Sequence, residues 1–192
     1  EQPQASAPLD QYSDGAESVG QINGTVTGSA VTNDVMSTIV LPTGAAAMNY
    51  HFGERPASLA GLAYVDLNND GVADTGEERL PTVTITLSGT TLGGADVCTV
   101  ITTCIVTTDA NGAYLFDGLP AGTYAVTQTQ PASYADGLDS PGNFGGAPVG
   151  TAGAAGTSAI SNITVPAGGT GVAFNFGETP SYLAGHAFFD PN

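Results

Sequence analysis

Apolar and polar residues alternate along much of this 192-residue chain, with the period of two that is typical of half-buried β-strands. Gly, Pro, Asn and Asp cluster between the alternating segments, and such clusters predict turns. Short strands at this spacing predict an all-β protein built as an antiparallel sandwich. The expected strands lie at residues 58–65, 82–89, 96–108 (as a hairpin), 113–117, 122–130, 158–165 and 170–177.

Two motifs predict where the chain turns tightly. Asp-Ala-Asn-Gly at residues 109–112 predicts a hairpin turn, because Asn-Gly adopts positive φ angles at little cost. Leu-Pro-Ala-Gly at residues 119–122 predicts a second tight turn. Residues 142–156 are nearly all Gly, Ala and Pro without periodicity, and we expect a loop there. The alternating side chains that we expect in the core are Tyr114, Phe116, Tyr124, Val126, Phe174 and Phe176.

An internal repeat divides the chain. Residues 12–20, YSDGAESVG, return as residues 134–142, YADGLDSPG, and residues 51–66, HFGERPASLAGLAYVD, return as residues 175–190, NFGETPSYLAGHAFFD. Such self-similarity predicts tandem copies of one structural unit, and we expect the chain to be a segment of a longer protein. The repeat predicts three parts: residues 1–54 as the C-terminal part of a preceding sandwich, residues 57–179 as a complete one, and residues 181–192 as the first strand of a following one.

Residues 66–77, DLNNDGVADTGE, match the twelve-residue calcium loop of an EF-hand, although strands rather than helices are predicted on both sides. Calcium takes six to eight oxygen ligands, which such a loop supplies from positions 1, 3, 5, 7, 9 and 12. Gly71 occupies position 6, where the sharp turn requires glycine. A solvated turn rich in Asp and Asn is the alternative interpretation. The predicted calcium ligands are Asp66, Asn68, Asp70, the Val72 carbonyl, Asp74 and Glu77, with Glu78 as a substitute for Glu77.

The predicted role of this Ca²⁺ is structural. Carboxylates gathered between two strands repel one another, and the cation removes that repulsion and fixes where the second strand begins. No helices are predicted beside the loop, so the opening motion of an EF-hand sensor is not expected. Two further pairs are weaker candidates for binding ions. One is Asp109 with Asn111, for which a plain hairpin turn is an equal alternative. The other is Asp136 with Asp139, and Asp14 and Glu17 stand at the corresponding positions of the other copy.

The charge balance narrows the range of partners. The chain has 18 acidic residues and two basic ones, Arg55 and Arg79, for a formal net charge of −16. Such a surface repels nucleic acid and anionic membranes and attracts divalent cations. No apolar run is long enough to cross a bilayer, and no signal-peptide pattern opens the chain. We therefore expect neither nucleic-acid binding nor membrane insertion.

Cys98 and Cys104 lie close together in a run rich in Thr, Val and Ile. In a reducing compartment, two Cys at this spacing without further Cys or His would be buried thiols or a poor metal pair. In an exported chain they can staple a hairpin, and a disulfide is our prediction. Because the loop that it closes is short, the expected stabilisation is about 2 kcal/mol.

Two stretches, GLAYVDLNNDGVADTGEERLPTVTITLSGT at residues 61–90 and YLFDGLPAGTYAV at residues 114–126, resemble the SdrD B-like domain, a calcium-binding repeat in the stalks of bacterial surface adhesins. That family belongs with the collagen-adhesin B-type, prealbumin-like sandwiches. The resemblance implies tandem antiparallel Greek-key β-sandwich repeats of the prealbumin-like or Ig-like type. It also implies an extracellular or cell-surface location and a structural, calcium-rigidified module of a stalk, adhesin or filament.

Two other binding functions remain open beside this one. A ligand-binding adhesive module usually presents exposed aromatic side chains on long loops, and Phe144 is the lone candidate on the longest predicted loop. A carbohydrate-binding accessory domain is disfavoured because the chain has no Trp and carries tandem copies. Catalysis is not expected, since His51 and His186 lie in strands of different units and match no catalytic pattern.

Domains related to this family can form a Lys-Asn isopeptide bond with the assistance of a Glu. This chain has no Lys, and Gln128 stands at the position that resembles that Glu, so the bond is excluded. Covalent stapling is therefore expected from the disulfide alone.

The expected partners are neighbouring repeats of the same protein or identical subunits. Residues 1–54 hold only the last strands of a sandwich, so alone they would expose an apolar face and an unpaired strand edge. Either a continuous tandem array covers that face, or residues 181–192 of a neighbouring subunit complete it by strand addition.

Overall fold

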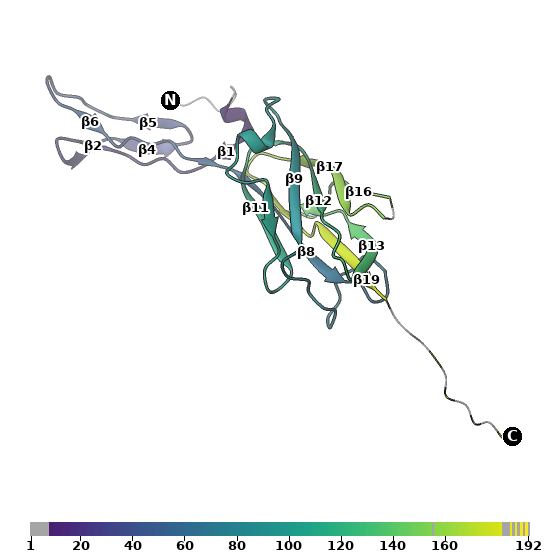
Figure 1. The fold of residues 1–192 in the computed structure, drawn as a ribbon. Coiled ribbons are helices and arrows are strands. Elements are labelled where there is room, and N and C mark those ends of the chain that lie inside the picture. The colour runs from purple at the N-terminus through teal and green to yellow at the C-terminus, as the bar shows by residue number, and fades with distance from the viewer. Residues whose placement is uncertain are drawn as a thin grey trace.

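The computed structural model describes residues 8–154 and 156–181, together with residues 185, 187, 189 and 191. Residues 57–180 form two β-sheets that pack face to face (Figure 1). The five strands of the first sheet are β9 (Thr84–Thr91), β10 (Ile105–Thr107), β12 (Gly122–Gln128), β16 (Thr151–Ala152) and β17 (Ala159–Val165). They pair antiparallel in the order β10-β9-β12-β17-β16.

The second sheet has seven strands, with β8 (Ala57–Val65) at its centre. The others are β11 (Ala113–Leu119), β13 (Tyr134–Ser140), β14 (Asn143–Phe144), β15 (Ala147–Pro148), β18 (Thr170–Val172) and β19 (Asn175–Pro180). The chain passes repeatedly between the two sheets, as it does in Greek-key sandwiches. The predicted all-β sandwich is confirmed, and one detail is added: β8 pairs in parallel with β18 and β19.

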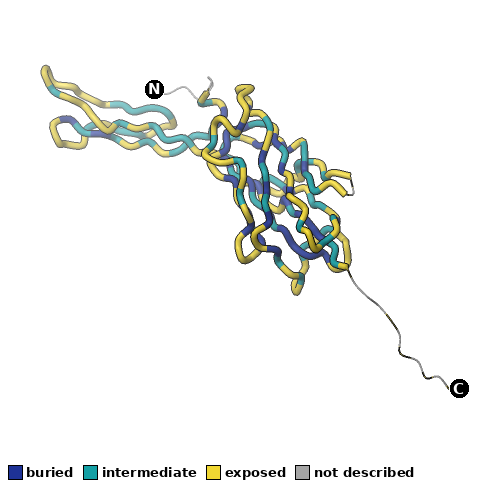
Figure 2. Tube along the Cα trace, in the orientation of Figure 1, coloured by how far each residue is buried: buried dark blue, intermediate teal, exposed yellow. Residues whose placement is uncertain are grey.

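The core lies between the two sheets, and alternate residues of the strands fill it (Figure 2). Two buried tyrosines also satisfy their hydroxyl groups there. Tyr114 donates to the Phe174 carbonyl at 2.7 Å, and Tyr124 donates to the Pro120 carbonyl at 2.8 Å. All six residues predicted for the core lie in it, which confirms the alternation: Tyr114, Phe116, Tyr124, Val126, Phe174 and Phe176.

The predicted hairpin at residues 96–108 is wrong. Its first half contains a short 3-10 helix, η2 (Val97–Thr99), because the Asp96 carboxylate accepts a hydrogen bond from the Cys98 amide at 2.9 Å. Val97 is fully buried in the core, which fixes the turn of this helix against the sheets. Of the two strands expected in residues 96–108, only β10 is present.

The loop expected at residues 142–156 is also partly wrong, because this segment contributes β14, β15 and β16. Strand β13, directly before it, was not predicted at all. Its sequence has no clear alternation, and its pairing along β19 holds it in place. The turn at residues 109–112 is confirmed, with Gly112 at a φ of +69°. The turn at residues 119–122 is confirmed as the tight connection between β11 and β12.

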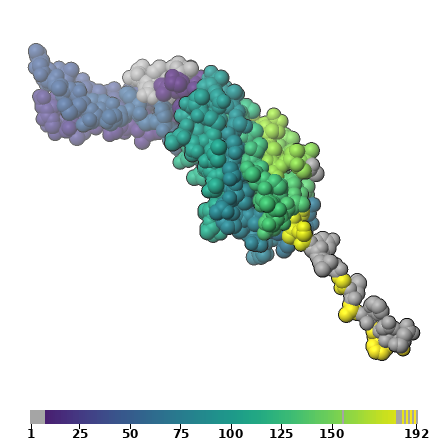
Figure 3. Space-filling view, in the orientation of Figure 1, coloured from purple at the N-terminus to yellow at the C-terminus, as the bar shows by residue number. Residues whose placement is uncertain are grey.

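Residues 13–55 form a narrow arm that projects from one end of the sandwich (Figures 1 and 3). At its base lies the 3-10 helix η1 (Leu9–Gln11), where the Gln11 carbonyl accepts a hydrogen bond from the Ala121 amide at 2.7 Å. The strands of the arm are β1 (Ser13–Asp14), β2 (Gln21–Ile22), β3 (Thr25–Val26), β4 (Ser29–Thr32), β5 (Val35–Ser37), β6 (Ala47–Met48) and β7 (Glu54–Arg55).

The strand pairings of the arm repeat those of the C-terminal half of the sandwich in the register of the sequence repeat. Strands β1 to β7 correspond in order to β13 to β19. Three pairs of opposite residues in the arm have counterparts in the sandwich. The pair Asp14–Glu54 corresponds to Asp136–Glu178, Gln21–Met48 corresponds to Asn143–Val172, and Ser29–Ser37 corresponds to Thr151–Ser161. The described part of the arm has no counterparts of β8 to β12. The division into a preceding, a complete and a following repeat stays a prediction.

Candidate metal centre

The loop at residues 66–77 leaves the end of β8, and Asp66 anchors it there. The Asp66 side chain is fully buried, at 0% exposed. Its carboxylate accepts hydrogen bonds from the backbone amides of Asp70 at 3.1 Å and Gly71 at 2.7 Å. Gly71 has a φ of +77°, a conformation that favours glycine. Asp66 therefore directs its carboxylate into the turn, where the first ligand of a calcium loop lies.

Asn68 and Asp70 face each other in the middle of the loop. The Asn68 side-chain amide donates to Asp70 Oδ2 at 2.9 Å, and Asp70 Oδ1 accepts a hydrogen bond from the Val72 amide at 2.8 Å. Both side chains are exposed on the outside of the sandwich. Their oxygens are therefore accessible to an ion from solvent.

Glu77 joins the two ends of the loop. Its Oε1 accepts a hydrogen bond from the Leu67 amide at 2.9 Å, and its Oε2 accepts one from the Asp74 amide at 2.8 Å. Glu78 is exposed, and its backbone carbonyl accepts a hydrogen bond from the Val65 amide at 2.8 Å. The structure thus favours Glu77 over Glu78 as the residue that closes the loop.

All of the predicted ligands are oxygen donors, which suits a hard cation such as Ca²⁺. In the structure, their carboxylates are satisfied mainly by backbone amides. Among the described residues, no three acidic side chains of this loop bring one oxygen each to within 4.8 Å of the others. Oxygen donors at all six ligand positions and the buried Asp66 carboxylate fit a calcium ion, whose charge would offset that of the carboxylates.

Arg79 holds the second half of the loop against β8. Its Nη2 donates to the carbonyls of Ala73 and Asp74, each at 3.4 Å. Its guanidinium carbon lies 5.6 Å from the centre of the Tyr64 ring. Burial raises the pKa of the Tyr64 hydroxyl far above its usual value, and the negative charge of the loop adds to the effect. Tyr64 therefore stays neutral beneath the loop.

The loop also contacts the neighbouring strands β13 and β19. The Ser140 hydroxyl donates to the Gly71 carbonyl, and the Asp66 amide donates to the Glu178 carbonyl at 2.8 Å. Asp136 and Asp139 lie on β13. The structure therefore brings the second predicted acidic pair onto a strand that contacts the first loop.

Asp136 and Asp139 are partly buried and differ in how far their oxygens are satisfied. The Asp136 carboxylate accepts hydrogen bonds from the Ser158 hydroxyl at 2.7 Å and the Gly156 amide at 2.6 Å. Asp139 Oδ2 accepts one from the Ala159 amide at 2.9 Å, whereas its Oδ1 is buried and has no partner among the described residues. Burial, together with the charge of Asp136, raises the pKa of Asp139 to about 7.

Glu178 is a fully buried carboxylate on β19. The side-chain amides of Gln128 and Gln130 donate to its two oxygens. Burial raises the pKa of Glu178, and these two hydrogen bonds act in the opposite direction. Gln128, the position that resembles the Glu of an isopeptide site, thus serves here to satisfy a buried carboxylate.

Asp109 and Asn111 belong to the hairpin turn. Asp109 Oδ1 accepts hydrogen bonds from the amides of Ala113 at 2.9 Å and Asn111 at 2.8 Å, and these bonds lower the pKa of Asp109. Within the described ranges, no group of three acidic side chains forms at this turn. These hydrogen bonds fit a hairpin turn, and an ion at Asp109 and Asn111 stays a prediction.

The arm contains an acidic cluster of which the sequence indicated Asp14 and Glu17 but not Asp34. Asp14, Glu17 and Asp34 each bring one carboxylate oxygen to within 4.8 Å of the others, and they are the one such group of three in the described part of the chain. Partial burial and the neighbouring carboxylates raise the pKa values of Asp14 and Asp34. Asp14 and Glu17 correspond to Asp136 and Asp139. Asp34 lies in the turn between β4 and β5, and only the pairing of those strands brings it near.

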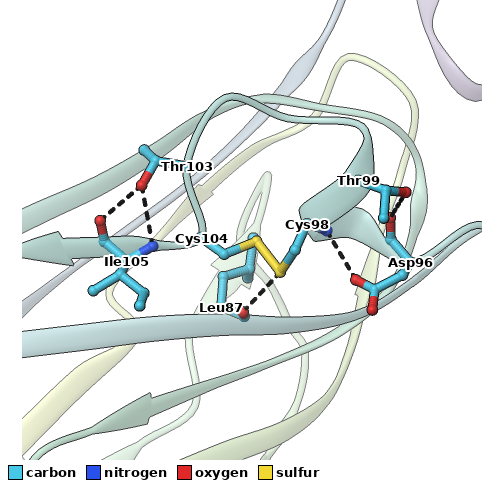
Figure 4. The surroundings of a disulfide bond; sticks show 7 residues. All are labelled: Leu87, Asp96, Cys98, Thr99, Thr103, Cys104 and Ile105. Carbon is cyan, nitrogen blue, oxygen red and sulfur yellow. Dashed lines mark hydrogen bonds between the residues drawn. A yellow bond between two sulfur atoms is a disulfide. The ribbon is translucent and has the colours of Figure 1, made fainter.

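Cys98 and Cys104 form a disulfide bond, as predicted (Figure 4). It joins η2 to the residue before β10, rather than two strands of a hairpin. Cys98 Sγ lies 3.5 Å from the Leu87 carbonyl oxygen, and the Leu87 amide donates to the Cys104 carbonyl at 2.8 Å. The disulfide therefore holds the η2 segment beside β9.

Phe144, the aromatic candidate for ligand binding, lies on β14 and packs against the core. Its ring centre is 6.0 Å from that of the fully buried Phe174, so the loop position expected for it is wrong. His51 is exposed and pairs with Ser18 through its backbone. His186 lies outside the described residues. No described helix has the length and apolar character that crossing a membrane requires.

The model of the SdrD B-like domain family matches residues 57–177, which include the loop at residues 66–77, the disulfide and both sheets except the end of β19. The chain belongs to the SdrD B-like domain family. SdrD B-like domains are found in bacterial surface adhesins and are in general not enzymes.

Two individual proteins are similar to parts of this chain. Colossin-B of Dictyostelium discoideum is 38% identical over 65 residues, an alignment that covers 33% of this chain and 2% of Colossin-B. Among solved structures, the Bacillus anthracis TIE protein aligns with 90% of this chain and 32% of that chain, at 15% identity and a TM-score of 0.36. This chain thus spans a small part of the length of either protein.

Proposed function

We propose that this chain is a structural repeat module of a bacterial extracellular stalk, adhesin or filament, and that Ca²⁺ bound by residues 66–77 stiffens it. One observation carries the proposal: the carboxylate of Asp66 is fully buried at the base of a loop that offers oxygen donors at every ligand position, five from side chains and one from the Val72 backbone carbonyl. Burying a carboxylate is costly unless hydrogen bonds and a counter-charge compensate it. A cation in the loop would supply that charge.

The residues of the loop would have distinct roles in binding the ion. Asp66 would bind from the end of β8, Asn68 and Asp70 from the middle of the loop, and Glu77 from the side that leads to β9. The Asp66 amide is also bonded to the carbonyl of Glu178 on β19. An ion at Asp66 would therefore strengthen the junction of β8 and β19, in addition to relieving the repulsion within the loop.

Calorimetric titration of the metal-free chain with Ca²⁺ tests the proposal. We expect Asp66→Asn to weaken calcium binding at least tenfold, because the substitution removes a charged ligand at a buried position. Asp117→Asn is the matched control. It makes the same change at an exposed residue of β11, whose carboxylate accepts a hydrogen bond from the adjacent Gly118 amide.

The control variant is expected to bind calcium as the unmodified chain does. Absence of calcium binding by the unmodified chain would end the proposal for this loop. Equal affinities for the unmodified chain and Asp66→Asn would place the ion elsewhere.

A second ion at Asp136 and Asp139 is a separate part of the proposal. The buried Oδ1 of Asp139, which has no partner among the described residues, supports it. In the same titration, Asp139→Asn is expected to lower the number of bound ions by one and to leave the site at residues 66–77 filled. An unchanged number of ions would remove this second site from the proposal.

An exported location is part of the proposed function. Disulfides persist in oxidising compartments, and the Cys98–Cys104 bond agrees with such a location. The ligand-binding and carbohydrate-binding alternatives are weaker, because Phe144 packs against the core and the chain has no Trp. We propose no catalytic role.

A further inference from the structure

Tyr64 carries a buried hydroxyl group beside the loop at residues 66–77. The residue lies near the end of β8 and is fully buried, and its hydroxyl oxygen has no hydrogen-bond partner among the described residues. Buried tyrosine hydroxyls normally have a partner, as those of Tyr114 and Tyr124 do. A buried polar group without a partner lowers the stability of the fold. The contacts within the described chain therefore do not explain why a hydroxyl stands at this position.

The contacts of the Tyr64 ring fix the position of this hydroxyl. Tyr64 and Arg79 are opposite residues of an antiparallel bridge, and the guanidinium carbon of Arg79 lies 5.6 Å from the ring centre. Arg79 also donates to the carbonyls of Ala73 and Asp74 in the loop. Arg79 thus holds the ring of Tyr64 and the second half of the loop together.

Asp66 approaches the same point of β19 as the Tyr64 hydroxyl. Gly177 on β19 lies opposite Tyr64 in the parallel pairing with β8. A Cβ atom on Gly177 would lie 3.2 Å from the Tyr64 hydroxyl oxygen and 3.2 Å from the Asp66 Cβ atom. Because glycine has no side chain, both groups can lie against its backbone. The Tyr64 hydroxyl and the buried ligand of the proposed calcium site are therefore neighbours across Gly177.

The Asp66 carboxylate can accept one more hydrogen bond beside an ion. A carboxylate has about four lone-pair sites on its two oxygens. The amides of Asp70 and Gly71 occupy two of them, and an ion would occupy a third. The remaining site suits a hydroxyl donor. Carboxylates that bind metals are themselves hydrogen-bonded by neighbouring groups, and these bonds orient them toward the ion.

We infer that Tyr64 is a positioning residue of the proposed calcium site: its hydroxyl donates a hydrogen bond to the Asp66 carboxylate when the ion is bound, directly or through one water molecule. The inference rests on the proposed function, because it requires an ion at residues 66–77. The bond orients the buried ligand toward the ion. Because the hydroxyl gains its partner only in the ion-bound chain, it also contributes to the affinity for calcium.

The variant Tyr64→Phe tests this role, because it removes the hydroxyl and keeps the ring. In calorimetric titration we expect it to bind calcium about 10- to 100-fold more weakly than the unmodified chain, the loss typical of removing a group that orients a metal ligand. Tyr124→Phe is the matched control, since it removes a buried hydroxyl that donates to the Pro120 carbonyl at 2.8 Å, and it is expected to leave the affinity unchanged. Equal affinities for the unmodified chain and Tyr64→Phe would overturn the inference.

Melting curves separate this role from a purely structural one. With a chelator, Tyr64→Phe should melt at the same temperature as the unmodified chain or at a higher one, because it removes a buried hydroxyl that has no partner. At a fixed calcium concentration it should melt at a lower temperature, because it binds the ion more weakly. Tyr124→Phe should melt at a lower temperature under both conditions, because it breaks a hydrogen bond of the ion-free chain. If Tyr64→Phe behaves with the chelator as Tyr124→Phe does, its role is structural and the inference is wrong.

Tyrosine absorption provides a measurement on the unmodified chain. A new hydrogen bond changes the environment of the hydroxyl, so we expect saturating calcium to produce a tyrosine difference spectrum, which Tyr64→Phe should lack. If calorimetry shows calcium binding and no difference spectrum appears, only this inference is refuted. If the unmodified chain binds no calcium, the proposed function fails and the inference fails with it.

Discussion

The complete sandwich and the arm share their strand pairings and differ in what those strands bury. Ile163 and Val165 on β17 are buried, whereas their counterparts in the arm, Ile39 and Leu41, are 38% and 56% exposed. Strand β17 pairs with β12 in a sheet that packs on a second sheet, and the described arm has no strand in the place of β12. Turns and backbone hydrogen bonds can therefore form the pairings locally, but a core requires the second layer.

Removing a matched aromatic side chain from each region is expected to give the largest difference. Phe176→Ala should lower the free energy of unfolding by about 3–5 kcal/mol, because it leaves a cavity in a closed core. Phe52→Ala should lower it by less than about 1 kcal/mol, because its side chain is already partly exposed. Urea denaturation followed by circular dichroism measures both. Equal losses would mean that the arm is part of the same cooperative core.

Removing calcium is expected to act mainly on the sandwich. A ligand at one hundred times its dissociation constant stabilises the folded state by about 2.7 kcal/mol, and a chelator abolishes that contribution. Amide hydrogen exchange should become faster in β8, where the loop begins, and in β19, which the loop contacts. It should change less in β2 and β6. Similar acceleration in both regions would show that the arm depends on the ion as well, and that the comparison does not hold for calcium.

The disulfide is expected to stabilise the sandwich by about 2 kcal/mol, since it closes a short loop. The double variant Cys98→Ser/Cys104→Ser should unfold at a correspondingly lower urea concentration, with no change in hydrogen exchange in the arm. Intact-mass measurement of the unmodified chain should show the loss of two hydrogens. Free thiols in the exported protein, or a double variant as stable as the parent, would contradict the assigned role.

The smallest expected effect is a pH dependence that distinguishes Asp139 from its counterpart Glu17. Because burial raises the pKa of Asp139 from 3.8 to about 7, the folded chain favours the protonated carboxyl. The resulting stability is fully present below the unfolded pKa and is lost as the pH rises through about 7. With a chelator present, the melting temperature should be roughly 2–4 °C higher at pH 5.5 than at pH 8.

Two substitutions sharpen that measurement. Asp139→Asn should remove most of the difference between the two pH values, since the side chain no longer titrates. Glu17→Gln in the arm should leave the difference in place. A pH dependence that survives Asp139→Asn would assign it to another buried carboxylate, such as Glu178.

Features that depend on neighbouring residues could be predicted from the sequence by itself. The alternation of apolar side chains identified the sandwich and all six expected core residues, because a strand repeats every two residues. The loop motif predicted the sharp turn at Gly71, which has a positive φ angle, since a tight turn is determined by the residues within it. The disulfide was also predicted, because so few residues separate Cys98 from Cys104.

Tertiary structure decided the features that depend on residues far apart in the chain. Strand β13 lacks a clear pattern of its own and forms because β19 lies beside it. Phe144 was expected on an exposed loop, whereas the pairing of β14 with β18 places its ring beside that of Phe174. Asp34 joins the acidic cluster of the arm only through the pairing of β4 with β5. In each case the partner lies outside the local window, so short-range periodicity carries no information about it.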